Sequence, residues 1–191
     1  MTCIACLTQN DRFYIAGDSR VSLNHSLVFD RSGSRKQDYP KIFKLNGFVF
    51  GVCGSVRVSN ALKYTLKLNV SETKDHTSIY SFMVNTFTKN IRDCLKESGC
   101  LSVYRESHEM NDCELISMYN GEVYYMSGDF SIVKIDNPYF AIGAGYSYAL
   151  GSLFSTIGIK NPSERVRLAV SSAANFENSV GGDIKVFSYK I

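Results

Sequence analysis

The sequence predicts an α+β fold in which two antiparallel sheets face each other and pairs of helices cover the outer sides, a four-layer αββα sandwich. Short apolar runs separated by turn residues form hairpins, and stretches with helical spacing of apolar residues come in pairs. Along the chain these blocks alternate as strands, two helices, strands, two helices and a last strand. The chain has 191 residues, 45% of them hydrophobic, which favours one domain spanning residues 1–191.

The first hairpin is expected at the start of the chain. Two apolar runs flank the polar turn Gln9–Arg12. Folding the chain about this turn places Thr2 opposite Ser19 and Cys3 opposite Asp18. Local geometry therefore brings the start of the chain beside Asp18.

The second hairpin carries the clearest turn signal in the chain. Asn46-Gly47 lies between the apolar runs 41–45 and 48–53. A type I′ turn needs positive φ at both central residues, which Asn and Gly tolerate. The open end of this hairpin is expected to bring Lys41 and Gly54 together.

The remaining elements follow from helical spacing and turn chemistry. Gly99 is expected to end the second helix, and Asn161-Pro162 to begin the fourth, because Asn caps helices and Pro fits the first helical position. The expected elements are a loop or weak ribbon at 24–38, helices at 55–69 and 78–96, a hairpin at 113–126 around Asn120-Gly121, a strand at 140–142, helices at 146–156 and 161–175, and a strand at 184–189.

Composition excludes several classes of function. The net charge of +3 and the absence of a basic run longer than Arg35-Lys36 argue against nucleic acid binding. No apolar run approaches the ~18 residues of a membrane span, and the start of the chain does not read as a signal peptide. A cytoplasmic location with free thiols is therefore expected.

One pair of cysteines has the spacing of a metal or redox motif. Cys3 and Cys6 have C-x-x-C spacing, but in a strand odd and even positions face opposite sides, so the two sulfurs should diverge. The sequence has no second C-x-x-C and no His pair at ligand spacing. We expect no metal and no other cofactor.

The two hairpins carry a set of groups suited to acyl transfer. Thr hydroxyl is a weak nucleophile that needs a base, and an N-terminal Thr carries its own, because its α-amine titrates near ~8. A Lys41 cation paired with Asp18 would lower the pKa of a neighbouring amine. The backbone N–H of Gly54, which leads into a helix, could stabilise an oxyanion. If the hairpins meet, Thr2, Asp18, Lys41 and Gly54 form one site.

Five short segments, taken in their order along the chain, point to a known family. Together they resemble the catalytic β-type subunits of the proteasome family, which includes HslV, the peptidase of the HslUV protease, and the resemblance runs through most of the chain. The segments are Ile15–Arg20, Pro40–Ile42, Gly51–Ser55, Ala141–Ala149 and Gly181–Ile184.

The resemblance implies an N-terminal nucleophile hydrolase: a threonine endopeptidase that hydrolyses peptide bonds in polypeptide substrates. Thr2, exposed by removal of Met1, would be nucleophile and base. The subunits would form a homo-oligomeric double ring enclosing a chamber, fed by an ATPase unfoldase or a cap. The implied roles are catalytic for Thr2, Asp18, Lys41 and Gly54, supporting for Ser19, Ala144, Glu177 and Ser179, and substrate-binding for Arg20, Val21, Ser22, Val52 and Val56.

The sequence departs from the family pattern in the supporting residues. The family usually has Ser where Ala144 stands. Its supporting acid and Ser would fall near Glu177 and Val180, and Ser179 would serve if the register slips by one. These departures favour an alternative, a catalytically inactive ring subunit with a structural or gating role.

Two further alternatives are weaker. Cys3 could be the nucleophile of a different amidase, but this requires removal of both Met1 and Thr2. Gly143-Ala-Gly145 could bind a nucleotide, but the last position of a G-x-G-x-x-G motif is occupied by Tyr148.

Overall fold

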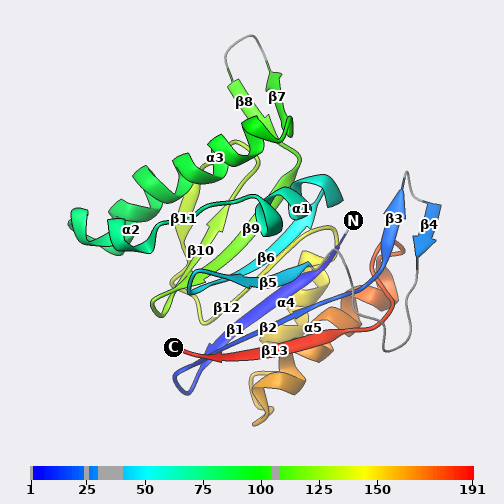
Figure 1. Cartoon of the computed structure of the whole chain (residues 1–191). Helices are drawn as coiled ribbons and strands as arrows, with labels where there is room; N and C mark the ends of the chain where they lie inside the picture. The colour runs from blue at the N-terminus through cyan, green and yellow to red at the C-terminus, as the bar shows by residue number, and fades with distance from the viewer. Residues whose placement is uncertain (1, 24–25, 30–40, 105–107) are drawn as a thin grey trace. The chain divides into compact units, whose positions relative to one another are not determined.

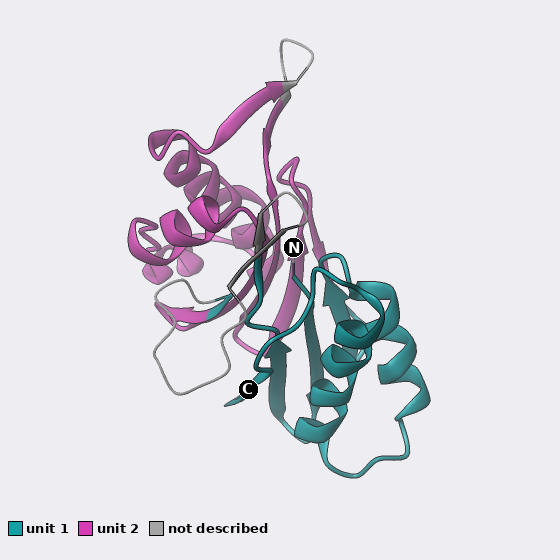
Figure 2. Cartoon of the chain, turned by 90° about the vertical axis from the view of Figure 1, so that its right-hand side faces the viewer, with its two compact units in different colours: residues 1–42, 135–191 teal, residues 43–134 magenta. Residues whose placement is uncertain are grey.

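The computed structural model describes residues 2–23, 26–29, 41–104 and 108–191, without the side chains of residues 22–40 and 104–108. It divides into two compact units (Figure 2). The first contains residues 1–42 and 135–191, and the second contains residues 43–134. Each unit combines an antiparallel sheet with helices, so the expected mixed fold with antiparallel sheets is confirmed (Figure 1).

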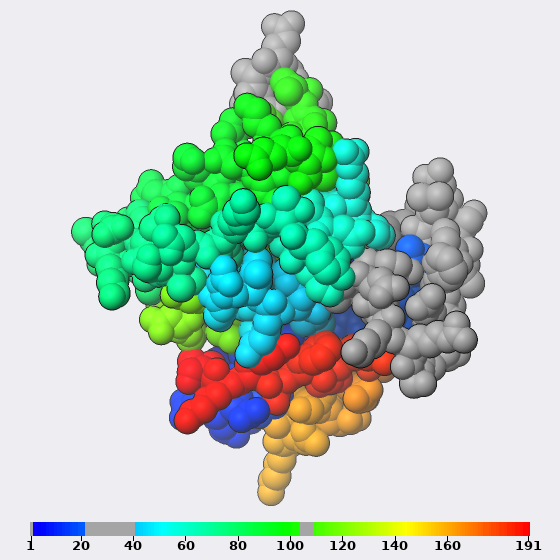
Figure 3. Space-filling model, viewed as in Figure 1, coloured from blue at the N-terminus to red at the C-terminus, as the bar shows by residue number. Residues whose placement is uncertain are grey.

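The first unit is built on a four-stranded antiparallel sheet with the order β12-β1-β2-β13. β13 is an edge strand, and its side chains are mostly exposed on the surface (Figure 3). The elements of this unit are β1 (Ile4–Gln9), β2 (Arg12–Gly17), β3 (Val21–Leu23), β4 (Ser26–Phe29), β12 (Tyr139–Ile142), α4 (Tyr146–Ser155), α5 (Pro162–Phe176) and β13 (Lys185–Lys190).

The first hairpin has the register expected from the sequence. Its turn residues Asn10 and Asp11 both have φ of 53°, as a type I′ turn requires. β1 and β2 then pair from Gln9 opposite Arg12 to Ile4 opposite Gly17. This register directs the start of the chain toward Asp18.

Helices α4 and α5 cover one face of the first sheet (Figure 1). Cys3, just before β1, and Ala5 and Leu7 of β1 are buried in a core with the inner faces of both helices. Asn161 caps α5, because its side chain accepts hydrogen bonds from the backbone N–H groups of the first turn. The expected helix pair is therefore present, with the expected cap.

The second unit has a five-stranded antiparallel sheet with the order β11-β10-β9-β6-β5. Asn46-Gly47 and Asn120-Gly121 both adopt positive φ, so the two expected Asn-Gly turns are confirmed. The elements are β5 (Ile42–Leu45), β6 (Phe48–Gly54), α1 (Val56–Tyr64), the 3₁₀ helix η1 (Val70–Asp75), α2 (Ile79–Phe82), the π-helix η2 (Met83–Phe87), α3 (Thr88–Glu97), β7 (Leu101–Tyr104), β8 (His108–Asn111), β9 (Cys113–Tyr119), β10 (Glu122–Met126) and β11 (Ile132–Lys134).

The expected helix over 78–96 contains an irregularity that the sequence pattern did not predict. Between α2 and α3 the chain makes the π turn η2, where the backbone N–H and the hydroxyl of Thr88 both donate to the carbonyl of Met83. Phe87 still packs on Phe48 and Phe50 of the sheet. Gly99, with φ of 63°, follows the end of α3 as expected.

Three short strands of the second unit, β7, β8 and β11, were not predicted. β7 and β8 form a ribbon that projects from the second unit, and β11 adds an edge strand beside β10 (Figure 1). β3 pairs with β4, which lies inside the stretch 24–38 expected to be a loop or weak ribbon, whereas β3 precedes it; most of that stretch lies outside the described residues. In the described part of the chain, no helix combines the length and the apolar character needed to cross a membrane.

Candidate active site

Thr2 and Asp18 are buried at one end of the β1–β2 hairpin. The Asp18 N–H donates to the carbonyl of Cys3 at 3.4 Å, and the Cys3 N–H donates to Asp18 Oδ1 at 3.0 Å. Thr2 is 4% exposed and Asp18 is 3% exposed. The predicted juxtaposition of Cys3 and Asp18 is therefore observed, and Thr2 directly precedes Cys3 in the chain.

Asp18 accepts hydrogen bonds from three separate segments of the first unit. Lys41 Nζ lies 2.8 Å from Oδ1, and the Gly181 N–H donates to Oδ2 at 3.1 Å, in addition to the bond from Cys3. Lys41 Nζ also donates to the carbonyl of Arg20 at 2.8 Å. The Asp18 side chain is fully buried and that of Lys41 is 13% exposed, so the ion pair is largely shielded from water.

The segment that leads from α5 to β13 completes this part of the site. The N–H groups of Ser19 and Arg20 both donate to the carbonyl of Gly181, at 3.1 and 2.9 Å. The Arg20 guanidinium donates to the carbonyls of Asn178 at 2.7 Å and Val180 at 3.1 Å. The resemblance placed Arg20 along a substrate channel, and these backbone contacts were not predicted. The double glycine at Gly181-Gly182 was the signal that could have found them.

Glu177 and Ser179 form a tight turn at the start of this segment. The hydroxyl and the N–H of Ser179 both donate to Glu177 Oε1, at 2.6 and 3.1 Å. The N–H of Val180 donates to the carbonyl of Glu177 at 2.9 Å. The two predicted supporting residues are thus bonded to each other, and Val180 is buried beside them.

The turn before α4 packs against Cys3, the residue after Thr2. A Cβ on Gly145 would lie 2.6 Å from Ala173 Cβ and 3.0 Å from Cys3 Cβ, so only glycine allows this close packing. Ala144, next to it, is exposed. The glycine serves helix packing here, and nothing in its surroundings favours the nucleotide-binding alternative.

The Cys3 alternative is disfavoured by burial. The Cys3 side chain is inaccessible to solvent, and its burial, together with the charge of Asp18, raises its pKa to about 12. A thiol in such a setting stays protonated and is a poor nucleophile. Cys3 belongs to the helix-side core whereas Cys6, also buried, does not, as expected for sulfurs that diverge on a strand. Among the described residues no three His, Cys, Asp or Glu side chains are grouped to hold a metal ion.

Gly54 lies in the second unit, at the end of β6. Its φ is +117°, and an added Cβ would lie 2.1 Å from the carbonyl oxygen of Asp112. The Ser55 N–H donates to that same carbonyl at 2.9 Å, which ties the Gly54–Ser55 turn to the start of β9. The position therefore requires glycine. Its role as oxyanion donor, and its closeness to Lys41, stay predictions.

The other predicted substrate-binding residues fall in different settings. Val52 is buried in the core of the second unit, whereas Val56, in the first turn of α1, is 39% exposed. Val21 is partly buried in β3, and the Ser22 side chain lies outside the described residues. Their contact with substrate stays a prediction.

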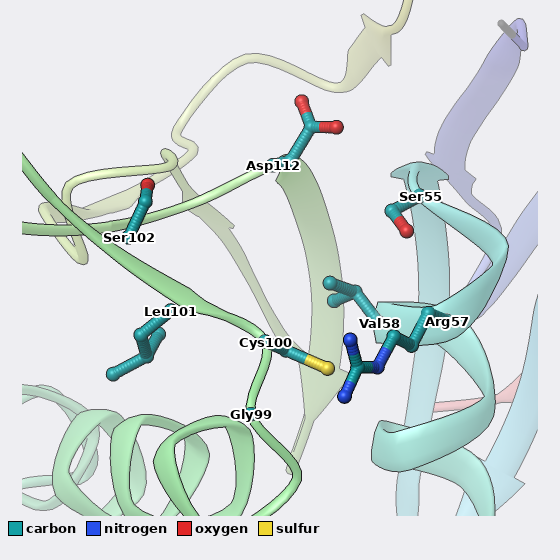
Figure 4. A pocket seen from close by; sticks show the side chains of 8 residues that line it. All are labelled: Ser55, Arg57, Val58, Gly99, Cys100, Leu101, Ser102 and Asp112. Carbon is teal, nitrogen blue, oxygen red and sulfur yellow. The ribbon is translucent and has the colours of Figure 1, made fainter.

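A pocket of about 250 Å³ lies in the second unit beside the N-terminus of α1 (Figure 4). Ser55, Arg57, Cys100 and Asp112 are among its lining residues. The Cys100 side chain points toward Arg57, whose guanidinium donates to the carbonyl of Ser98 at 2.8 Å. The half-buried Cys100 is the most accessible of the six free cysteines.

Comparison with known proteins shows similarity in structure and none in sequence families. No protein-family model matches the chain, and no curated protein matches it either. Among solved structures, Thiobacillus denitrificans BPH matches with a TM-score of 0.78 and 16% identity, over 99% of this chain and 98% of that chain. A second structure of that protein is in complex with Epoxomicin and matches with a TM-score of 0.75.

Two further solved structures extend the same similarity. Eukaryotic HslV from Trypanosoma brucei matches with a TM-score of 0.68 and 18% identity over the whole of both chains. Anbu, an ancestral beta-subunit from Yersinia bercovieri, matches with a TM-score of 0.64 and 17% identity, over 99% of this chain and 81% of that chain. The chain therefore has the fold of the HslV-type, proteasome-like peptidases, which confirms the expected fold relationship along its full length.

Proposed function

We propose that the protein is a threonine endopeptidase subunit of a ring-shaped, proteasome-like protease, with Thr2 as nucleophile after removal of Met1. The observation that carries the proposal is the buried Asp18–Lys41 ion pair, whose carboxylate accepts a hydrogen bond from the N–H of Cys3, the residue after Thr2. A buried ion pair is costly to build, because both groups must be desolvated. Such a pair beside a candidate N-terminal nucleophile is better explained by chemistry than by stability.

The proposed reaction follows the chemistry of an N-terminal nucleophile. The free α-amine of Thr2 takes the hydroxyl proton while the oxygen attacks the scissile carbonyl. The Lys41 cation keeps the pKa of that amine low enough for it to act as a base near neutral pH. The Gly54 N–H stabilises the oxyanion, the amine passes the proton to the leaving group, and water then hydrolyses the acyl-enzyme.

The proposal also includes the arrangement of the two units and the assembly. The two sheets stack face to face within a single domain, in the four-layer order of the N-terminal nucleophile hydrolases. Phe154, Ile157 and Phe176, which lie on or next to the helix pair α4–α5, are about 70% exposed, and exposed apolar surface of this kind favours an assembly contact. We place the protein in a reducing cytoplasm, as a homo-oligomeric double ring that takes polypeptide substrates from an ATPase unfoldase or cap.

The inactive ring subunit remains a second candidate for a specific reason. Ala144 offers no hydroxyl at the position where the family has Ser, and Val180 offers none at the end of the closing turn. A subunit that keeps the ion pair but lacks these hydroxyls could serve assembly alone.

Intact mass before and after treatment with an epoxyketone separates the two candidates. Catalysis predicts loss of Met1 and one adduct, located at Thr2. The variant Thr2→Ala should form rings but take no adduct, and Thr2→Ser, which keeps a hydroxyl, should still react. Retention of Met1 with no adduct in the wild-type protein would reject catalysis and leave the structural role.

A further inference from the structure

We propose that Arg20 is a positioning residue, which holds the segment 178–181 so that the Gly181 N–H can support Asp18. This inference rests on the proposed function and replaces the expectation that Arg20 contacts substrate. It starts from two observations: where the Arg20 guanidinium donates its hydrogen bonds, and why residue 181 has no side chain.

Arg20 forms hydrogen bonds both with the closing segment 178–181 and with Lys41 of the ion pair. Its guanidinium donates to the carbonyls of Asn178 and Val180 at 2.7 and 3.1 Å, and its N–H donates to the carbonyl of Gly181 at 2.9 Å. Its own carbonyl accepts from Lys41 Nζ at 2.8 Å. A single residue thus joins the closing segment to the lysine.

The guanidinium occupies the space next to Gly181. A Cβ on Gly181 would lie 2.5 Å from Arg20 Cζ and 2.6 Å from Nη2. Gly181 does not have positive φ, so its backbone alone would accept alanine. The requirement for glycine therefore comes from Arg20, and Gly181→Ala should act by displacing the guanidinium.

Displacement of Arg20 should reach Asp18 through one hydrogen bond. Among the described residues, the Gly181 N–H is one of three donors to the fully buried Asp18 carboxylate, and the one that comes from the closing segment. When that donor moves, the carboxylate is free to turn, and Lys41 moves with it. Small displacements of catalytic groups commonly cost up to about 100-fold in rate.

The positioning role and the substrate role predict different kinetics. Loss of a substrate contact would raise KM and leave kcat unchanged. Loss of a positioning contact should lower kcat by about 10- to 100-fold with little change in KM. It should also move the acidic limb of the pH–rate profile to higher pH, because a displaced Lys41 cation no longer lowers the pKa of the Thr2 amine.

The test is a double-mutant cycle between Arg20→Ala and Gly181→Ala. Each single variant should lower kcat and shift the profile, and the double variant should be no worse than Arg20→Ala, because removal of the guanidinium leaves room for the new methyl group. Gly158→Ala is the matched control, since nothing lies within 4 Å of its added Cβ. Independent, additive losses in the cycle, or a change in KM alone, would overturn the proposal.

Hydrogen exchange at the Gly181 amide gives a readout that needs no activity. Arg20→Ala should speed exchange at this amide, whereas Gly158→Ala should leave it unchanged. Unchanged protection in Arg20→Ala would overturn the positioning role even if the enzyme is active. A third outcome combines faster exchange in Arg20→Ala with a wild-type protein that takes no epoxyketone. It would retain the positioning of Asp18 by Arg20 and reject only the proposed function.

Discussion

Replacing Lys41 by Met or Asp18 by Asn should each destabilise the protein strongly. Replacing both together should cost less unfolding free energy than the sum of the two single losses. The two side chains lie 2.8 Å apart and are 13% and 0% exposed. At an effective dielectric constant of about 20, the gross attraction between charges at this distance is about 6 kcal/mol. Desolvation offsets much of it, but removal of one partner leaves the other buried without its counter-charge, which typically costs about 3–5 kcal/mol.

The assay is a double-mutant cycle of Lys41→Met and Asp18→Asn by urea unfolding. The chain has no tryptophan, so far-UV circular dichroism is the suitable signal. Each single variant should lose about 3–5 kcal/mol of unfolding free energy, and the double variant should recover about 2–3 kcal/mol of the sum. Protein concentration must stay fixed, because the proposed ring assembly would also contribute to apparent stability.

The ion pair between Lys89 and Asp93 on α3 is the matched control. Its Nζ–Oδ2 distance of 2.7 Å is nearly the same, but its side chains are 69% and 39% exposed. A cycle of Lys89→Met and Asp93→Asn should show coupling within experimental error, because water and salt screen exposed pairs. Additive losses at Lys41 and Asp18, or equal coupling in both cycles, would refute the argument that burial makes the pair strong.

Two further predictions concern the second unit. A Cβ on Gly54 would lie 2.1 Å from the Asp112 carbonyl oxygen, so the turn must shift in Gly54→Ala. This variant should form the epoxyketone adduct about 100- to 1000-fold more slowly. An unchanged rate would exclude Gly54 as the oxyanion donor. Iodoacetamide at pH 8 should modify Cys100 first, because it is the most accessible cysteine. Burial and the charge of Asp18 raise the pKa of Cys3 from an ordinary value of 9.0 to about 12. Cys3 should therefore react about a thousandfold more slowly. Mass spectrometry of wild type and Cys100→Ser checks this, and rapid labelling of Cys3 would contradict its burial.

Much of the fold could be predicted because its signals are local. The Asn46-Gly47 and Asn120-Gly121 turns need positive φ, and both adopt it. The Asn161 cap and the register of the first hairpin likewise depend on residues close in sequence. The π turn η2 and the β7–β8 ribbon were missed, because apolar spacing does not distinguish a π turn from an α-helix and the ribbon is short.

The sequence by itself determined that the start of the chain folds back beside Asp18, since the turn and the strands that flank it fall within the first 18 residues. Only the tertiary structure decided how Asp18 is supported. The Gly181 N–H reaches its carboxylate from 163 positions away, and the Arg20 guanidinium binds carbonyls 158 and 160 positions away. In each of these bonds one partner is a backbone group, which no side-chain type marks in the sequence, so Gly181-Gly182 hints at a close approach but only the folded chain shows which side chains are bonded.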